Sequence, residues 1–222
     1  MSEIDAFMDY VDAHEFSIPP SLRCIDLLHR SVPPSFRKEV RELAPSLLDL
    51  LCTDRLEELR VAMFFDGMSR RWLPSALEVA ALPGHLELRS IAPIQSGDVE
   101  AAAAVVRNAL QPLPVRGEEL PETLLPTGDR AGPAAPDGQP SRLGAVLQAM
   151  HAVTSARRAS IEASHRATCV SRSDYQVAQK AIDCAYSASM AIWYGAVGHQ
   201  APVDELWRDV IRVFRAASSA TE

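Results

Sequence analysis

The chain of 222 residues is long enough for one large domain or two small ones, and it can bury a substantial hydrophobic core. Hydrophobic residues make up 47% of the chain and charged residues 23%, a balance that argues against global disorder. The net charge is −7 and no segment is strongly basic, so we expect neither a nucleic-acid surface nor a polybasic membrane patch.

The four cysteines show neither a CxxC pair nor the spacing of a disulfide scaffold: they are Cys24, Cys52, Cys169 and Cys184. The N-terminus (MSEIDAFMDY) is acidic where a signal peptide would be basic, and no stretch reaches the roughly 18 apolar residues of a membrane span. The basic residues are nearly all arginine, and this bias, with the abundant Ala and Pro, indicates a GC-rich bacterial genome. We therefore expect a bacterial protein of the reducing cytoplasm.

Residues 112–140 interrupt the chain, because prolines and glycines throughout this segment oppose regular structure. We interpret the segment as a Pro/Gly-rich linker or flap. It separates an N-terminal part of short helices, 1–111, from a C-terminal part, 141–222. The expected fold class is all-α: a multi-helix bundle with a long C-terminal antiparallel helical hairpin plus a docking helix. Both parts could share one core.

Prolines punctuate the short helices of the N-terminal part. A helix is predicted over about 20–31, between two Pro-Pro pairs, and another begins at Pro34 and ends or kinks at Pro45. Asp54 and Glu57 resemble a capping box at the start of the next helix.

Three further elements complete the N-terminal part. Pro74 suits the first turn of a helix that extends to about Leu82. Residues 85–91 (HLELRSI) alternate apolar and polar side chains as a short strand would, although no partner strand is visible. Ser96 is expected to cap a helix that ends before Pro112.

Two long helices form the predicted hairpin. Residues 141–169 contain no proline and one glycine, which predicts a helix about 43 Å long. Ser173 and Gln176 resemble a capping box for the second helix. On both helices alanines recur at spacings of three and four, which would let the helices approach closely. These alanines are Ala145, Ala149, Ala152, Ala156, Ala159 and Ala163 on the first helix, and Ala178, Ala181, Ala185 and Ala188 on the second.

Bulky apolar residues occupy the opposite face of the first long helix: Leu143, Val146, Leu147, Met150 and Ile161. Arg157 falls within this stripe, so we expect an internal carboxylate or a bound ligand beside it. The last helix starts at Pro202, and its single apolar face predicts that it docks on the hairpin. Its other face carries charges of both signs, unlike a membrane-surface helix.

Glu162, His165 and Cys169 stand at i, i+3 and i+7, so on a helix they project from one side. Three interpretations are open. Di-iron helical bundles use Glu-x-x-His pairs, with further ligands from other helices. Alternatively, His165 withdraws the Cys169 proton while Glu162 orients the ring, although a helix C-terminus disfavours a thiolate. The interpretation we favour is a solvated helix edge that binds no metal or cofactor.

Residues 165–182 (HRATCVSRSDYQVAQKAI) resemble a helix-turn-helix core of repressor type, with a recognition helix from Ser173. The resemblance implies a DNA-binding regulator, but the segment departs from the pattern. Cys169 stands where a glycine is usual, Asp174 would face phosphates, and the preceding helix is too long. We expect no nucleic-acid partner from it.

Apolar and aromatic residues supply the candidate partner surfaces. One gathers late in the second long helix, at Met190, Trp193, Tyr194 and Val197, and is rich in residue types enriched at interface cores. The other joins Trp72 to Arg70 and Arg71. For both clusters the alternative is burial in the core.

The function expected from these features is a non-enzymatic helical protein-binding module: an adaptor, an inhibitor or an immunity-type partner of a bacterial effector. Its partner would be another protein, and it would need neither a cofactor nor a membrane. A metal-binding or Cys/His-dependent enzyme and a helix-turn-helix DNA-binding regulator are the alternatives. The sequence leaves the oligomeric state open.

Overall fold

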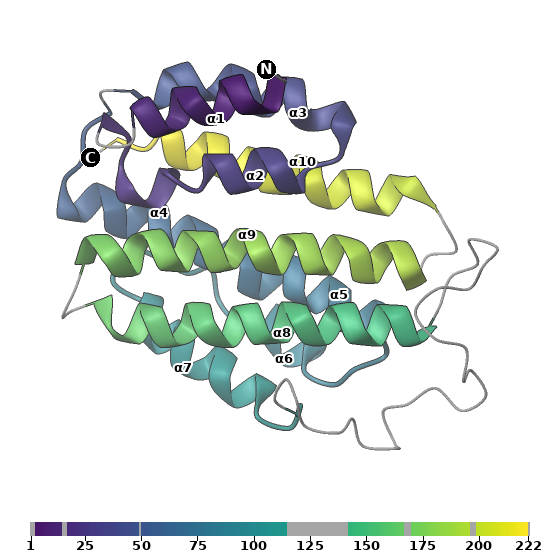
Figure 1. Cartoon of the computed structure of the whole chain (residues 1–222). Helices are drawn as coiled ribbons and strands as arrows, with labels where there is room; N and C mark the ends of the chain where they lie inside the picture. Colours follow the sequence, from purple (N-terminus) through teal and green to yellow (C-terminus); the bar gives the residue numbers. More distant parts are fainter. Residues whose placement is uncertain are drawn as a thin grey trace.

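The computed structural model describes residues 3–14, 17–48, 50–114, 142–166, 170–195 and 199–221. Throughout these residues the regular structure is helical and there is no strand, which confirms the all-α expectation (Figure 1). The α-helices are α1 (Glu3–Ala13), α2 (Ile25–Ser31), α3 (Pro34–Leu43), α4 (Asp54–Gly67), α5 (Leu73–Val79), α6 (His85–Arg89), α7 (Val99–Leu110), α8 (Arg142–Ser164), α9 (Val170–Gly195) and α10 (Gln200–Ser218). Two 3-10 turns, η2 (Pro20–Leu22) and η3 (Ala44–Leu47), and a π-helical turn, η4 (Met68–Trp72), complete the set.

The helices α8 and α9 lie side by side and antiparallel, forming the predicted hairpin (Figure 1). All the alanines predicted to line this contact are buried, on both helices. At the open end of the hairpin the Tyr194 ring lies against Gly144, where an added Cβ would stand 2.9 Å from the ring. Small side chains therefore let two long helices pack closely along their length.

The bulky stripe of α8 faces outward more than its composition suggests. Leu143 and Leu147 are only partly buried and Ile161 is 46% exposed, while the alanine face is completely covered. The alanine face of α8, which has less apolar area than the bulky face, therefore packs against α9. Its small side chains permit the shortest distance between the two helices.

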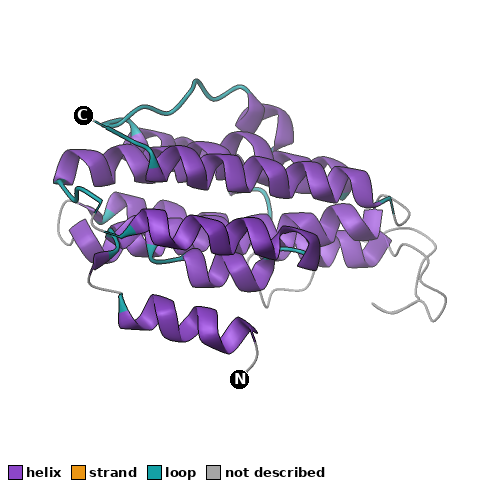
Figure 2. Ribbon diagram, turned by 90° about the horizontal axis from the view of Figure 1, so that it is seen from above, coloured by secondary structure: helices purple, strands orange, loops and turns teal. Residues whose placement is uncertain are grey.

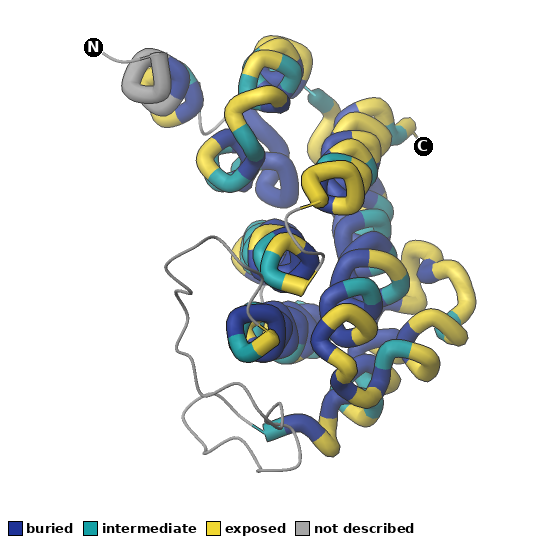
Figure 3. Tube along the Cα trace, turned by 90° about the vertical axis from the view of Figure 1, so that its right-hand side faces the viewer, coloured by how far each residue is buried: buried dark blue, intermediate teal, exposed yellow. Residues whose placement is uncertain are grey.

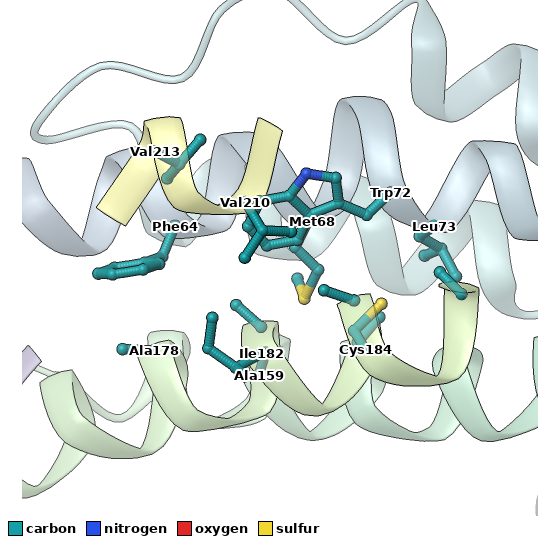
Figure 4. Close-up of a cluster of buried hydrophobic side chains, with 14 of the residues drawn as sticks. Phe64, Met68, Trp72, Leu73, Ala159, Ala178, Ile182, Cys184, Val210 and Val213 are labelled. Carbon is teal, nitrogen blue, oxygen red and sulfur yellow. The ribbon is translucent and has the colours of Figure 1, made fainter. Parts of the chain in front are cut away.

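The core lies around α9, which packs against α8 on one side and against α4, α5 and α10 on the other. One continuous buried cluster joins residues on both sides of 115–141, from Phe7 to Ala217. Figure 4 shows part of it, where Trp72 lies beside Val210 of α10 and the Met68 side chain extends toward α9. Figure 2 shows α1 at the edge of the bundle, where it rests on α2 through buried Phe7 and Val11.

A single helical run extends from Asp54 to Val79, because α4 passes into α5 through the π-helical turn. The turn brings the Trp72 ring back over Gly67, where a Cβ would lie 2.7 Å from the ring. Pro74 stands just after the turn, in the first positions of α5, where a missing N–H is tolerated. The sequence predicted that a new helix begins at Pro74. It did not predict that α4 and α5 form one continuous helical run.

Several expected boundaries in the N-terminal part are wrong. The predicted helix 20–31 is a 3-10 turn followed by α2. Thr53, not Asp54, caps α4, and its hydroxyl accepts a bond from the Leu56 amide. Within the expected strand 85–91, His85–Arg89 form the short helix α6, entered through Gly84 at φ +96°. Gly84 adopts this left-handed conformation without steric cost, because it has no Cβ.

The C-terminal boundaries also shift. The first long helix ends at Ser164 instead of continuing to Cys169, and α9 already begins at Val170. Ser173 therefore lies buried within the first turn of α9 and does not precede the helix. Pro202 falls in the first turn of α10, which begins at Gln200.

The close contact of α8 and α9 predicts a penalty for any larger side chain between them. Ala185→Leu inserts three carbons into a filled space and is expected to destabilise the fold by about 1–3 kcal/mol. Urea unfolding measures the change, with Ala101→Leu on the exposed side of α7 as the control that should stay within about 0.5 kcal/mol. Equal stability of the two variants would contradict the close packing.

Candidate functional site

Asp209 of α10 gathers three donors at the junction with the π-helical turn. The Trp72 indole Nε1 donates to Asp209 Oδ2 at 2.9 Å, and the Arg71 Nε lies 3.1 Å from the same oxygen. Arg212 donates to Oδ1 at 3.2 Å. The indole bond fixes the orientation of a tryptophan that is only 1% exposed, so Trp72 belongs to the core and forms the wall of a groove.

This groove lies between α5 and α10 and has a volume of about 820 Å³. Apolar side chains from three helices form its floor, among them Val79, Ile192 and Leu206. At Gly195 the end of α9 comes against Val79, so the start of α10 lies beside the end of α5. The two helices bordering the groove therefore run antiparallel.

Charges in the groove are divided between its two ends. Glu78 and Glu205 lie at the end beside Val79, whereas Arg71, Arg208 and Arg212 gather around Asp209 at the other end. Of the two arginines that the sequence singled out, Arg71 lines the groove. Arg70 instead donates to Asp66 at 2.9 Å, and Asp66 also accepts the Ile94 amide.

A second surface runs along the outer face of α9. Tyr186, Met190 and Trp193 stand at i, i+4 and i+7, which places them on one side of the helix; we call them the α9 aromatic stripe. Tyr186 is 45% exposed and Trp193 is 41% exposed, whereas the other two tryptophans are each 1% exposed. Tyr194 instead covers Gly144 of α8, and Val197 lies outside the described residues.

The proposed Glu162, His165 and Cys169 cluster is only partly described. Glu162 is half-buried and His165 is exposed at the end of α8, while Cys169 lies outside the described residues. Within the described part of the chain, no group of three or more His, Cys, Asp and Glu side chains is placed to hold a metal ion. Burial raises the pKa of the Cys24 and Cys184 thiols, which disfavours a reactive thiolate at either position.

Asp174, expected in the helix-turn-helix interpretation to face phosphates, lies buried near the start of α9, whereas Arg172 is exposed. Asp174 is 0% exposed and accepts a bond at 2.7 Å from Arg166 at the end of α8. Burial raises the pKa of Asp174, and the Arg166 guanidinium opposes that rise. The two helices lie side by side and antiparallel (Figure 1).

Arg157 contacts the end of a neighbouring helix. Its guanidinium donates to the backbone oxygens of Leu110 and Leu113 at 2.6 Å and of Pro114 at 3.1 Å. These carbonyls lie at and just beyond the C-terminus of α7, the negative end of the helix dipole. Arg157 therefore caps α7, and the expected carboxylate or ligand beside it stays a prediction.

A buried polar cluster, which the sequence patterns did not predict, joins η2, α4 and the end of α10. Glu57 accepts the Ser21 amide at 2.8 Å and hydroxyl at 3.1 Å, and it pairs with Arg60 at 2.7 Å. Arg60 also donates to the Ala217 carbonyl at 3.2 Å. The spacing of Glu57 and Arg60 could have revealed the pair, but the capping-box interpretation assigned Glu57 to the helix start.

His29 is a further buried group. Its ring stacks on Phe7 at 4.4 Å, it is 1% exposed, and its nitrogens have no hydrogen-bond partner in the described part of the chain. Burial lowers the pKa of His29, and the positive charges of Arg41 and Arg37 lower it further. The neutral ring therefore suits the contact between α1 and α2.

The comparisons with other proteins add nothing to this geometry. The chain matches no protein-family model, no curated protein and no solved structure. None of the described helices is long and apolar enough to cross a membrane. The candidate surfaces are therefore the groove between α5 and α10 and the α9 aromatic stripe.

The buried Glu57–Arg60 pair predicts a large penalty when one partner is removed. Arg60→Met leaves a desolvated carboxylate and is expected to lower the free energy of unfolding by about 3–5 kcal/mol in urea titrations. Adding Glu57→Gln should recover part of the loss. The exposed Arg30→Met serves as the control, since surface pairs contribute about 0–1 kcal/mol. A loss for Arg60→Met no larger than the control's would contradict the buried pair.

The lowered pKa of His29 predicts a pH-dependent stability. The unfolded state takes up a proton as the pH falls through about 6.5, while native His29 stays neutral to lower pH, so acidification favours unfolding. His29→Leu removes this contribution, and the stability of the variant relative to wild type should rise between pH 7.5 and pH 5. Urea unfolding at both pH values measures it, with exposed His151→Leu as control. A pH-independent difference would contradict the shift.

Proposed function

We propose that this chain is a non-enzymatic helical protein-binding module, and that the α9 aromatic stripe is its contact surface. The observation that carries the proposal is the exposure of Trp193 beside Met190 and Tyr186 on one face of a long helix. Tryptophan and tyrosine dominate the binding energy of protein interfaces, and methionine adapts to irregular partner surfaces.

The setting of the stripe favours binding. It belongs to the central helix of the bundle, whose other sides are buried against α8, α4, α5 and α10. A rigid helix loses little backbone freedom on association, which lowers the ordering cost of binding. The matching surface on a partner is an apolar pocket or groove wide enough for an indole.

An adaptor, an inhibitor or an immunity-type partner of a bacterial effector fits such a surface. A bacterial cytoplasmic location belongs to the same proposal; the free thiols of Cys24, Cys52 and Cys184 and the preference for arginine over lysine support it. The partner is a protein, because a stripe of aromatic side chains with few charges offers little to a phosphate backbone.

The test compares variants of the full chain as bait in a nuclease-treated lysate of the source organism, read by mass spectrometry. Trp193→Ala is expected to reduce the retained partner at least about tenfold, because truncating a central interface tryptophan typically exceeds 2 kcal/mol. Leu86→Ala, at a residue that is 66% exposed on α6, is the matched control and should retain the partner.

Thermal unfolding accompanies the comparison, since truncation of an exposed side chain should leave the melting temperature nearly unchanged. Loss of the partner by folded Trp193→Ala alone supports the proposal. Equal retention by wild type and Trp193→Ala would reject the stripe as the contact surface, and an empty wild-type bait would reject the binding module.

A further inference from the structure

The groove-facing side of α10 carries an ordered pattern of charges. Glu205, Arg208, Asp209 and Arg212 follow one another as acid, base, acid and base. Residues at equal distances on the two sides of the midpoint between Arg208 and Asp209 carry opposite charges. Glu205 and Arg212 are equally far from that midpoint and carry opposite charges, and so do Arg208 and Asp209.

Such a pattern is complementary to itself when the helix direction is reversed. In an antiparallel pair of α10 helices centred on the midpoint, each Glu205 faces Arg212 of the second copy, and each Arg208 faces Asp209. A twofold axis generates this arrangement, which is the usual symmetry of a homodimer. A parallel pair in the same register would instead place like charges opposite one another.

Small residues extend the same face at both ends. Ala201 and Ala216 are exposed and equally distant from the midpoint. At 100° per residue, these alanines and the four charged residues fall within a sector of about 100° on α10. With only methyl groups at the two ends, the side chains there leave the charged pairs at the centre of the contact to set the distance between the helices.

Three of the four charged groups on this face are exposed, whereas Asp209 is half-buried and held by Trp72 and Arg71. Glu205 and Arg208 are exposed, and neither makes a hydrogen bond or ion pair within the described chain. Arg212 is 74% exposed and makes one contact, at 3.2 Å to Asp209. Arg71 and Trp72 continue to hold Asp209 when Arg212 turns outward. Figure 3 shows the exposed outer side of α10, the helix that leads to the C-terminus.

We propose that two copies of this chain associate through antiparallel α10 helices, about a twofold axis that passes between Arg208 and Asp209. The groove between α5 and α10 gives the second copy's side chains room beside the helix contact. The α9 aromatic stripe is not part of this contact. The test of the dimer is therefore independent of the test of the proposed function.

The experiment measures the mass of the full chain by sedimentation equilibrium from micromolar concentrations to about 1 mM, at low and high salt. Wild type should form a dimer that weakens as salt increases, because exposed charge pairs are screened. Glu205→Arg and Arg212→Glu each place like charges at both symmetric contacts, and each should raise the dimer dissociation constant at least about tenfold.

Mixing the two variants provides the decisive measurement. In the mixed dimer the new arginine faces the new glutamate at one contact, and the original pair is restored at the other, so the dimer should return. Glu100→Arg on α7 and Arg158→Glu on α8 change the net charge equally at exposed positions away from α10, and they should dimerise as wild type does.

Recovery upon mixing supports the antiparallel pairing. A wild-type chain that stays monomeric throughout would overturn the proposal, as would a dimer that neither charge reversal weakens. Two monomeric variants that stay monomeric when mixed would also overturn it. Thermal unfolding of each variant verifies that the chain is folded, since Arg212→Glu removes a bond to Asp209.

Discussion

The close approach of α8 and α9 is the constraint on which the rest of the structure depends. The alanines of both helices are buried, and at the open end Gly144 makes room for the Tyr194 ring. On its other sides α9 packs against α4, α5 and α10. Buried Phe64, Met68 and Trp72 gather beside α9 there, so the large side chains of the core lie around this helix (Figure 4).

Arginines connect the outer elements to this centre. Arg60 joins α4 to the end of α10, Arg157 caps α7 from α8, and Arg166 connects α8 to the buried Asp174 of α9. In each case one guanidinium donates to polar groups of another segment, because it offers five donors in a planar fork. The bias toward arginine in the composition therefore has a structural consequence, whatever its genomic origin.

The sequence predicted the features that depend on helical periodicity and failed on those that depend on neighbours. The alanine spacing identified the α8–α9 hairpin, since it repeats over several turns. The strand expected at 85–91 failed because Gly84 and the packing of α6 outweigh a short alternation. The partners of Arg157 and Arg60 come from segments distant in sequence, so no local pattern could name them. Trp193 was identified as a candidate for exposure with Trp72, and only the packing of α10 over the π-helical turn distinguishes them.

The π-helical turn between α4 and α5 determines which side of α5 faces the core for a given orientation of α4. Before the turn, Phe64 contacts Phe214 of α10; after it, the buried Leu73 lies toward α9 (Figure 4). The wider turn accommodates a residue that a regular α-helix has no place for. Loss of one residue there would rotate α5 by about 100° and turn Arg71 and Val79 away from the groove. Insertion or deletion of a residue in this segment would therefore disturb the fold more than substitution of one.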